Sequence, residues 1–142
     1  MGLVVGQSTW QYTKCFPENI ALGRIAPNQS GYLICKSGGV GWVVAPASTT
    51  VSREWASYGD AVTTAQAAHA CGDWFVPTCA QLQNPGYTCR EYWESYCSTV
   101  YWSATQNDSF RAWGLNFSNG TLDGNTARNI SYCIRAFRCV TY

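Results

Sequence analysis

Eight cysteines in a chain of 142 residues are the feature that most constrains this sequence. An even number of cysteines in a small domain is typical of proteins that fold in an oxidising compartment, where disulfides hold loop-rich structures together. We therefore expect structural disulfides. The candidate residues are Cys15, Cys35, Cys71, Cys79, Cys89, Cys97, Cys133 and Cys139.

The cysteine spacing leaves many pairings open, because connectivity does not follow from sequence alone. Cys133 and Cys139 are expected to share one strand, and in an extended strand they would be too far apart to bridge each other. We expect the pairs Cys97–Cys133 and Cys15–Cys35.

Metal and catalytic sites built on cysteine are not indicated. No two cysteines are separated by two residues, and His69 is the only histidine, so the spacing of a zinc site is missing. His69 and Cys71 lie two positions apart on an expected helix and face different directions, which argues against a catalytic dyad. The acidic residues around the helices do not form a marked pair for glycoside hydrolysis. We expect no catalytic residue and no metal.

Charge is scarce: nine residues are basic and eight acidic, and the net charge is +1. A nucleic-acid binder would need clustered lysine and arginine, so this class is excluded. The 46% hydrophobic content excludes a disordered chain. No apolar run approaches the ~20 residues of a membrane span. Low charge suits a surface that packs against protein, so we expect a homo-oligomer, such as a trimer, or a place in a larger assembly such as a virion.

Alternating apolar residues and turn signals predict strands in both halves of the chain. Ser37-Gly-Gly39 and Asn119-Gly120 each stand between apolar runs and predict hairpins. From residue 100 onward the pattern is that of an antiparallel meander. The expected strands are Tyr32–Lys36, Gly41–Ala45, Tyr101–Thr105, Ala112–Phe117 and Ile134–Val140.

Helical signals occupy the middle of the chain. Asp60 is a suitable cap for a helix through Ala68 that ends at Cys71-Gly72. The order of strands, helices and meander predicts an α+β domain over residues 31–142, preceded by an arm over residues 1–30. Two further helix starts have capping-box spacing, namely Thr78 with Gln81 and Thr88 with Glu91.

Four short motifs follow one another in the order of a known family. Gly72-Asp-Trp-Phe-Val-Pro-Thr78 with Gln81-Leu82 is similar to a GWRLPT motif followed by EL, and Tyr101-Trp-Ser-Ala-Thr105 is similar to YWSST. Ala112-Trp113 with Phe117 and Gly120, and the final Ile134-Arg-Ala-Phe-Arg138, are similar to the last motifs of that family. Together they resemble the Lcl C-terminal-like domain, over roughly residues 40–140.

The resemblance implies a C-type-lectin-like fold with an antiparallel meander and two short helices. This fold is shared with phage tropism and receptor-binding proteins, with bacterial adhesins and, more distantly, with formylglycine-generating enzymes. The chain departs from the family at Phe75, where the family has arginine, and at Ala136, where it has proline. Additional cysteines suggest that disulfides replace polar ties of the family; they are Cys79, Cys97, Cys133 and Cys139.

The candidate ligand-binding residues lie in the loops of the meander. Sugar-binding lectins of this fold carry Glu-Pro-Asn or Gln-Pro-Asp with Trp-Asn-Asp for Ca²⁺, and none of these triplets occurs. Two carboxylates of these loops, together with backbone carbonyls, could hold Ca²⁺. Turn formation is sufficient to explain the Asn and Asp residues there, so we expect no cofactor. The candidates are Asn107, Asp108, Phe110, Arg111, Asn119, Asp123 and Asn125.

Two further expectations concern the core. Alternation places Trp102 and Trp113 with other apolar residues, so both are expected on the inner sheet face. Arg135 and Arg138 are expected to be buried partners of acidic residues, with Asp73 and Glu94 as the candidates.

These observations predict a non-enzymatic protein of the extracellular space or the virion surface. It would serve in phage capsid decoration, tail adhesion or host recognition, through contacts with protein or glycan. A secreted bacterial adhesin or carbohydrate-binding domain is the alternative; an enzyme of the formylglycine-generating type is disfavoured because the chain is too short for that substrate groove. The first residues lack the basic region of a secretory signal. Three situations would reconcile the missing signal with the cysteine count. The chain could be a mature form without its signal, it could be a virion component that works outside the cell, or its cysteines could be reduced and merely packed.

Overall fold

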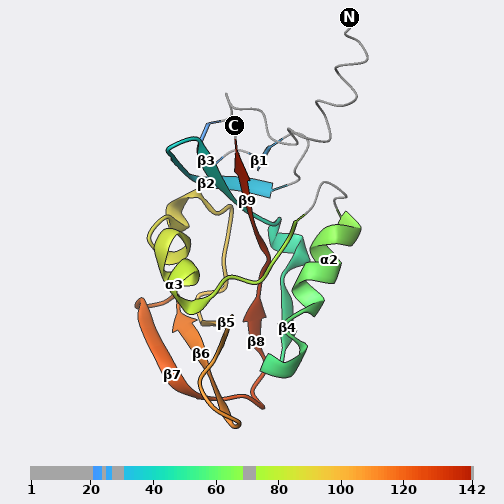
Figure 1. Cartoon of the computed structure of the whole chain (residues 1–142), viewed down its shortest axis with the longest axis vertical. Helices are drawn as coiled ribbons and strands as arrows, with labels where there is room; N and C mark the ends of the chain where they lie inside the picture. Colours follow the sequence, from blue (N-terminus) through green and yellow to red (C-terminus); the bar gives the residue numbers. More distant parts are fainter. Residues whose placement is uncertain (1–20, 24, 27–30, 69–72, 142) are drawn as a thin grey trace, which may run out of the picture.

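The computed structural model describes residues 21–23, 25–26, 31–68 and 73–141, and its strands form two sheets (Figure 1). The first has the order β1-β2-β3-β9 and is antiparallel throughout. The second has the order β4-β8-β5-β6-β7, with β5 and β8 as its parallel neighbours. The strands of the first sheet are β1 (Ile25–Ala26), β2 (Gly31–Ser37), β3 (Val40–Val44) and β9 (Phe137–Thr141). Those of the second are β4 (Val51–Arg53), β8 (Tyr132–Ile134), β5 (Val100–Gln106), β6 (Arg111–Asn116) and β7 (Thr121–Ala127).

Short helices connect the sheets, so the α+β class is confirmed. α2 spans Asp60–Ala68 as expected, while its predicted end at Cys71-Gly72 lies outside the described residues. No helix in the described part of the chain is long and apolar enough to cross a membrane. The other helical segments are α3 (Cys79–Gln81), η1 (Ala47–Thr49), η2 (Trp55–Ser57), η3 (Leu82–Tyr87) and η4 (Arg90–Tyr92).

One of the two predicted capping boxes forms. Thr78 accepts a hydrogen bond from the Gln81 backbone, and the Gln81 side chain accepts one from the Thr78 backbone. The prediction at Thr88 is wrong, because its hydroxyl donates back to the Gln83 carbonyl and η4 begins after Cys89 without a side-chain cap. A side chain that closes the preceding turn is no longer available to start the next one.

Both predicted hairpins are confirmed. Gly38 and Gly39 have φ of 59° and 81° and form the two-residue connection between β2 and β3. Gly120, with φ of 79°, closes the turn between β6 and β7. Positive φ at these positions costs a glycine nothing, which is why these sequences form the tight turns.

The expected strand Ile134–Val140 is divided into β8 and β9, which belong to different sheets. The chain leaves one sheet at Arg135 and joins the other after Ala136. At this corner the Ala136 carbonyl accepts a hydrogen bond from the Ala45 backbone. Both halves are buried, including Arg135 and Arg138, so the segment shows no alternation that could reveal the break.

An aromatic cluster joins residues of the two sheets. The Trp93 ring lies 5.1 Å from the Phe117 ring and 5.6 Å from those of Tyr101 and Phe137, centroid to centroid. All four side chains are buried. Trp102 is buried as predicted, whereas Trp113 is only half-buried, so the expectation of a fully inward Trp113 is wrong. Burial of such large rings dominates the apolar contribution to folding.

The motif Tyr101–Thr105 holds neighbouring loops through its polar atoms. The Tyr101 hydroxyl accepts from the Cys97 backbone at 2.9 Å, and the Trp102 indole donates to the Ile130 carbonyl at 3.0 Å. Thr105 accepts from the Cys79 backbone at the start of α3. In this chain, the residues that resemble a family motif therefore act in packing.

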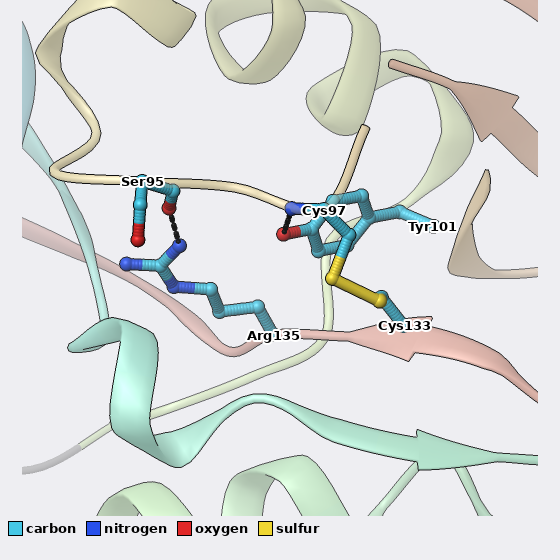
Figure 2. Close-up of a disulfide and its surroundings, with 5 residues drawn as sticks. All are labelled: Ser95, Cys97, Tyr101, Cys133 and Arg135. Atoms are coloured by element: carbon cyan, nitrogen blue, oxygen red, sulfur yellow. Dashed lines mark hydrogen bonds between the residues drawn. A yellow bond between two sulfur atoms is a disulfide. The ribbon is translucent and has the colours of Figure 1, made fainter. Parts of the chain in front are cut away.

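Arg135 is 2% exposed and lies where the two sheets meet (Figure 2). Its Nε donates to the Ala45 carbonyl at 2.7 Å, and a terminal nitrogen donates to the Ser95 carbonyl. The guanidinium also lies 5.1 Å from the centre of the Trp93 ring. Burial lowers the pKa of Arg135, and the nearby Tyr101, Tyr32 and Glu94 raise it in part.

The expectation that Arg135 and Arg138 are ion-paired is not met among the described residues. Arg135 is held by carbonyls and a ring, with Glu94 acting only at a distance. Arg138 is also buried; burial lowers its pKa, and Asp73 opposes that change. Carbonyl oxygens take two of the Arg135 donors. Among the described residues, its other terminal nitrogen has no hydrogen-bond partner, and neither do Nε and one terminal nitrogen of Arg138.

The predicted disulfide Cys97–Cys133 is confirmed and ties the segment before β5 to β8 (Figure 2). In the expected pair Cys15–Cys35, Cys15 lies outside the described residues, and Cys35 is a free thiol, so this pair is not formed in the structure. Cys79, Cys89 and Cys139 are free as well, and Cys71 lies outside the described residues. Most of the expected arm lies there too, but Ile25–Ala26 pairs with β2, so part of it joins the first sheet.

We expect Arg135→Ala to lower the free energy of unfolding by about 3 kcal/mol, because the Ala45 and Ser95 carbonyls lose their buried donor. Urea denaturation measures the change. Arg53→Ala is the control: this arginine pairs with Asp60 at 3.0 Å while both side chains are about half exposed, so its loss should cost less than about 1 kcal/mol. Equal effects of the two substitutions would contradict the role given to Arg135.

Candidate recognition site

The predicted ligand-binding residues fall on two surfaces of the second sheet. Asn107, Asp108, Phe110 and Arg111 lie at the turn between β5 and β6, at the end of the molecule far from β1, β2 and β3 (Figure 1). The others lie at the β6–β7 turn and along β7, namely Asn119, Asp123 and Asn125. The structure therefore divides them into two groups.

The β5–β6 turn is held by Asp108. One carboxylate oxygen accepts the backbone N–H groups of Phe110 and Arg111, both at 2.8 Å. These bonds, with the nearby Arg111 and Arg128 cations, lower the pKa of Asp108 although its desolvation opposes the change. Asn107 adds a bond from its amide to the Gly124 carbonyl at 2.6 Å. The Asn107-Asp108 sequence thus forms the predicted turn, and its two side chains stabilise that turn by hydrogen bonds to backbone groups.

Arg128 fixes the other side of this turn. Its guanidinium donates to the Asp108 and Ser109 carbonyls at 3.1 and 2.9 Å and lies 4.3 Å from the centre of the Trp55 ring. Its backbone donates to the Phe110 carbonyl at 3.0 Å. The buried Trp55 indole donates to the Ser103 carbonyl, which connects the turn to the core of the sheet.

Phe110 projects from this ordered turn with 77% of its surface exposed. It borders an open pocket of about 440 Å³ between the turn, the end of β7 and η2. We call this surface the Phe110 pocket. Its lining combines an aromatic ring, a carboxylate, a guanidinium, a hydroxyl and an amide, from Glu54, Ala56, Ser109, Phe110, Ala127, Arg128 and Asn129.

The second group contributes to a smaller hollow of about 180 Å³ that includes Asn119 and Asp123. Here the side chains are already used in turns: Asn119 accepts from the Thr121 backbone and Asp123 from the Asn125 backbone. Asn125 is exposed on β7 and is not part of this hollow. The Phe110 pocket differs from this hollow in carrying a large aromatic side chain that is mostly exposed.

The Phe110 pocket combines an aromatic side chain with polar and charged ones. Within the described ranges, no three histidine, cysteine or acidic residues are grouped as metal ligands. Stacking on the ring and hydrogen bonding to the surrounding polar groups are the interactions that the pocket offers.

Sequence analysis did not identify Glu54, Trp55 or Arg128 as part of this site. They come from segments that precede α2 and follow β7, and only the pairing of the sheet brings them to the β5–β6 turn. The sequence carries no local signal for them.

No family model and no curated protein sequence matches this chain.

We expect the amide protons of Phe110 and Arg111 to shift as Asp108 is protonated, with a midpoint below its ordinary pKa of 3.8. Because the folded-state pKa is lowered, these bonds are fully present above 3.8 and are lost as the pH falls through the lower value. NMR titration of the two amides measures this. Asp108→Asn keeps an acceptor and should abolish the titration; a midpoint at or above 3.8 would contradict the hydrogen bonds.

Proposed function

We propose that this protein is a non-enzymatic recognition module of a cell or virion exterior, and that it binds a host-surface glycan through the Phe110 pocket. The observation that carries the proposal is the exposed Phe110 on a turn fixed by Asp108 and Arg128. An aromatic residue costs solvation free energy when it is left exposed, and a turn that is already ordered has little entropy to lose on binding.

The composition of the pocket supports a carbohydrate ligand. An aromatic face can stack on the apolar side of a sugar ring, while Glu54, Arg128 and Asn129 offer partners for its hydroxyl groups. The pocket is open to solvent, which suits the end of an extended glycan. A protein epitope presents similar chemistry and is the alternative outcome of the binding experiment.

The fold and setting belong to the same proposal. Two sheets joined through short helices, with a long meander and a disulfide, are compatible with the C-type-lectin-like fold that the four motifs suggest. Modules of that kind occur on phage virions and among secreted bacterial adhesins, and we propose the virion surface first.

We expect Phe110→Ala to weaken glycan binding by about 30-fold or more, the effect of losing a central aromatic contact. A glycan array identifies the ligand, and titration with that glycan measures the affinity. The side chain is exposed, so the thermal midpoint should stay within about 1 °C of the original. Leu22→Ala is the control, because Leu22 is 37% exposed and is not among the residues that line the pocket.

The array should be run with and without a calcium chelator, and binding should be the same in both. Retention of full glycan affinity by Phe110→Ala would contradict the assignment of the pocket. Binding to host protein but to no glycan would replace the carbohydrate ligand by a protein epitope.

We also expect a homo-oligomer in solution. Charged surface groups normally oppose association between copies of a protein, and this chain has few of them. Light scattering at micromolar concentration should give a mass that is a multiple of 15.6 kDa, with three copies as the expected number. A monodisperse species at the mass of one chain would contradict this expectation.

A further inference from the structure

Two of the free cysteines pack against the same buried cluster, away from the residues that line the Phe110 pocket. Cys35 is on β2, and Cys89 directly precedes η4; both are half-buried. The Cys35 thiol lies close enough to the Cys89 thiol to contribute to the rise in its pKa. Their elements also pack together, since β2 touches both η3 and η4, and both cysteines border the aromatic cluster around Trp93.

We propose that Cys35 and Cys89 form a second disulfide when the protein meets a disulfide oxidant such as oxidised glutathione. This inference is independent of the proposed function. β2 packs against η3 and η4, and these two helical segments flank Cys89 in the sequence, so the two cysteines belong to segments that touch. A disulfide between them requires their Cα atoms to lie about 4.4–6.8 Å apart.

The reaction balances as two successive exchanges. One cysteine thiolate attacks oxidised glutathione, forming a mixed disulfide and releasing one glutathione thiolate. The second cysteine then attacks the cysteine sulfur of the mixed disulfide and releases the other glutathione. Two cysteines are oxidised, one glutathione disulfide is reduced to two thiols, and the two cysteine protons pass to the released thiolates.

The protonation of Cys89 affects the rate of this exchange. Burial, and after it the neighbouring Cys35, raise the pKa of the Cys89 thiol. The thiolate is the reacting form, so the raised pKa slows attack by Cys89 at neutral pH.

A Cys35–Cys89 bond would add a second covalent attachment to the segment that runs from Cys89 to Cys97. Cys89 and Cys97 begin and end a connecting segment, and Cys97 is already bonded to Cys133 on β8 of the second sheet. A Cys35–Cys89 bond would fix the other end of the segment to β2 of the first sheet. Each end would then be covalently attached to a different sheet.

The test is a peptide map of the full chain, treated with oxidised glutathione, blocked with N-ethylmaleimide and cut with trypsin without reduction. Cleavage after Arg24, Lys36, Arg53 and Arg90 gives a peptide 25–36 with Cys35 alone, and a peptide 54–90 with Cys71, Cys79 and Cys89. We expect the two joined, with a mass two hydrogens below their sum, and fragmentation to place the bond at Cys89.

Two matched variants show which cysteine is bonded to Cys35. Cys89→Ser should leave peptide 25–36 alkylated, whereas Cys79→Ser should keep the link. Oxidation should also raise the thermal midpoint of the original protein by about 5 °C or more, and should not raise that of Cys35→Ser.

Three results would overturn the proposal. Peptide 25–36 could remain alkylated in protein whose Cys97–Cys133 bond is intact. It could instead be joined to peptide 15–24, which carries Cys15. The fragmentation of the original protein could place the bond at Cys71 or Cys79; this readout needs no variant and so does not depend on whether the substituted chains fold.

Discussion

The fold depends on a cation that is buried where its two sheets meet. Removing a guanidinium from water costs several kcal/mol, which only well-placed acceptors offset. For Arg135 these acceptors are the Ala45 carbonyl after β3, the Ser95 carbonyl in the connecting segment, and the face of Trp93. They come from two parts of the chain, Ala45 and the segment around Trp93 and Ser95, which are both far from Arg135 in sequence. These groups surround the cation only in the native arrangement of both sheets, so the cation selects this arrangement over other compact ones.

Local signals predicted most of the elements. The glycines of the β2–β3 and β6–β7 turns, the capping box at Thr78 and the apolar face of α2 each act within a few residues, and each is confirmed. The Cys97–Cys133 pair was also predicted. The division of 134–140 between two sheets was not, because it depends on where Arg135 finds its acceptors, which are up to 90 residues away in sequence. The assignment of sheet partners needs such non-local information.

The residues of the candidate site could likewise be predicted only where local sequence signals identify them. Turn chemistry identified Asn107, Asp108, Phe110 and Arg111 correctly as surface residues of one turn. It grouped them with Asn119, Asp123 and Asn125, although the hairpin sends these to another part of the sheet. Arg128 was missed because an arginine at the end of a strand carries no local mark. Its importance arises from two carbonyls and an indole ring that three-dimensional folding brings within reach.

The ordering of the β5–β6 turn also bears on how this protein can change over generations. The turn is fixed by the Asp108 carboxylate, the Arg128 guanidinium and backbone groups, including the amide and carbonyl of Phe110. The phenyl ring itself takes no part in these bonds and is mostly in solvent. Selection can therefore exchange the side chain at position 110 without a penalty in folding. A change of ligand range would then need a single codon, while the scaffold that displays it stays constant.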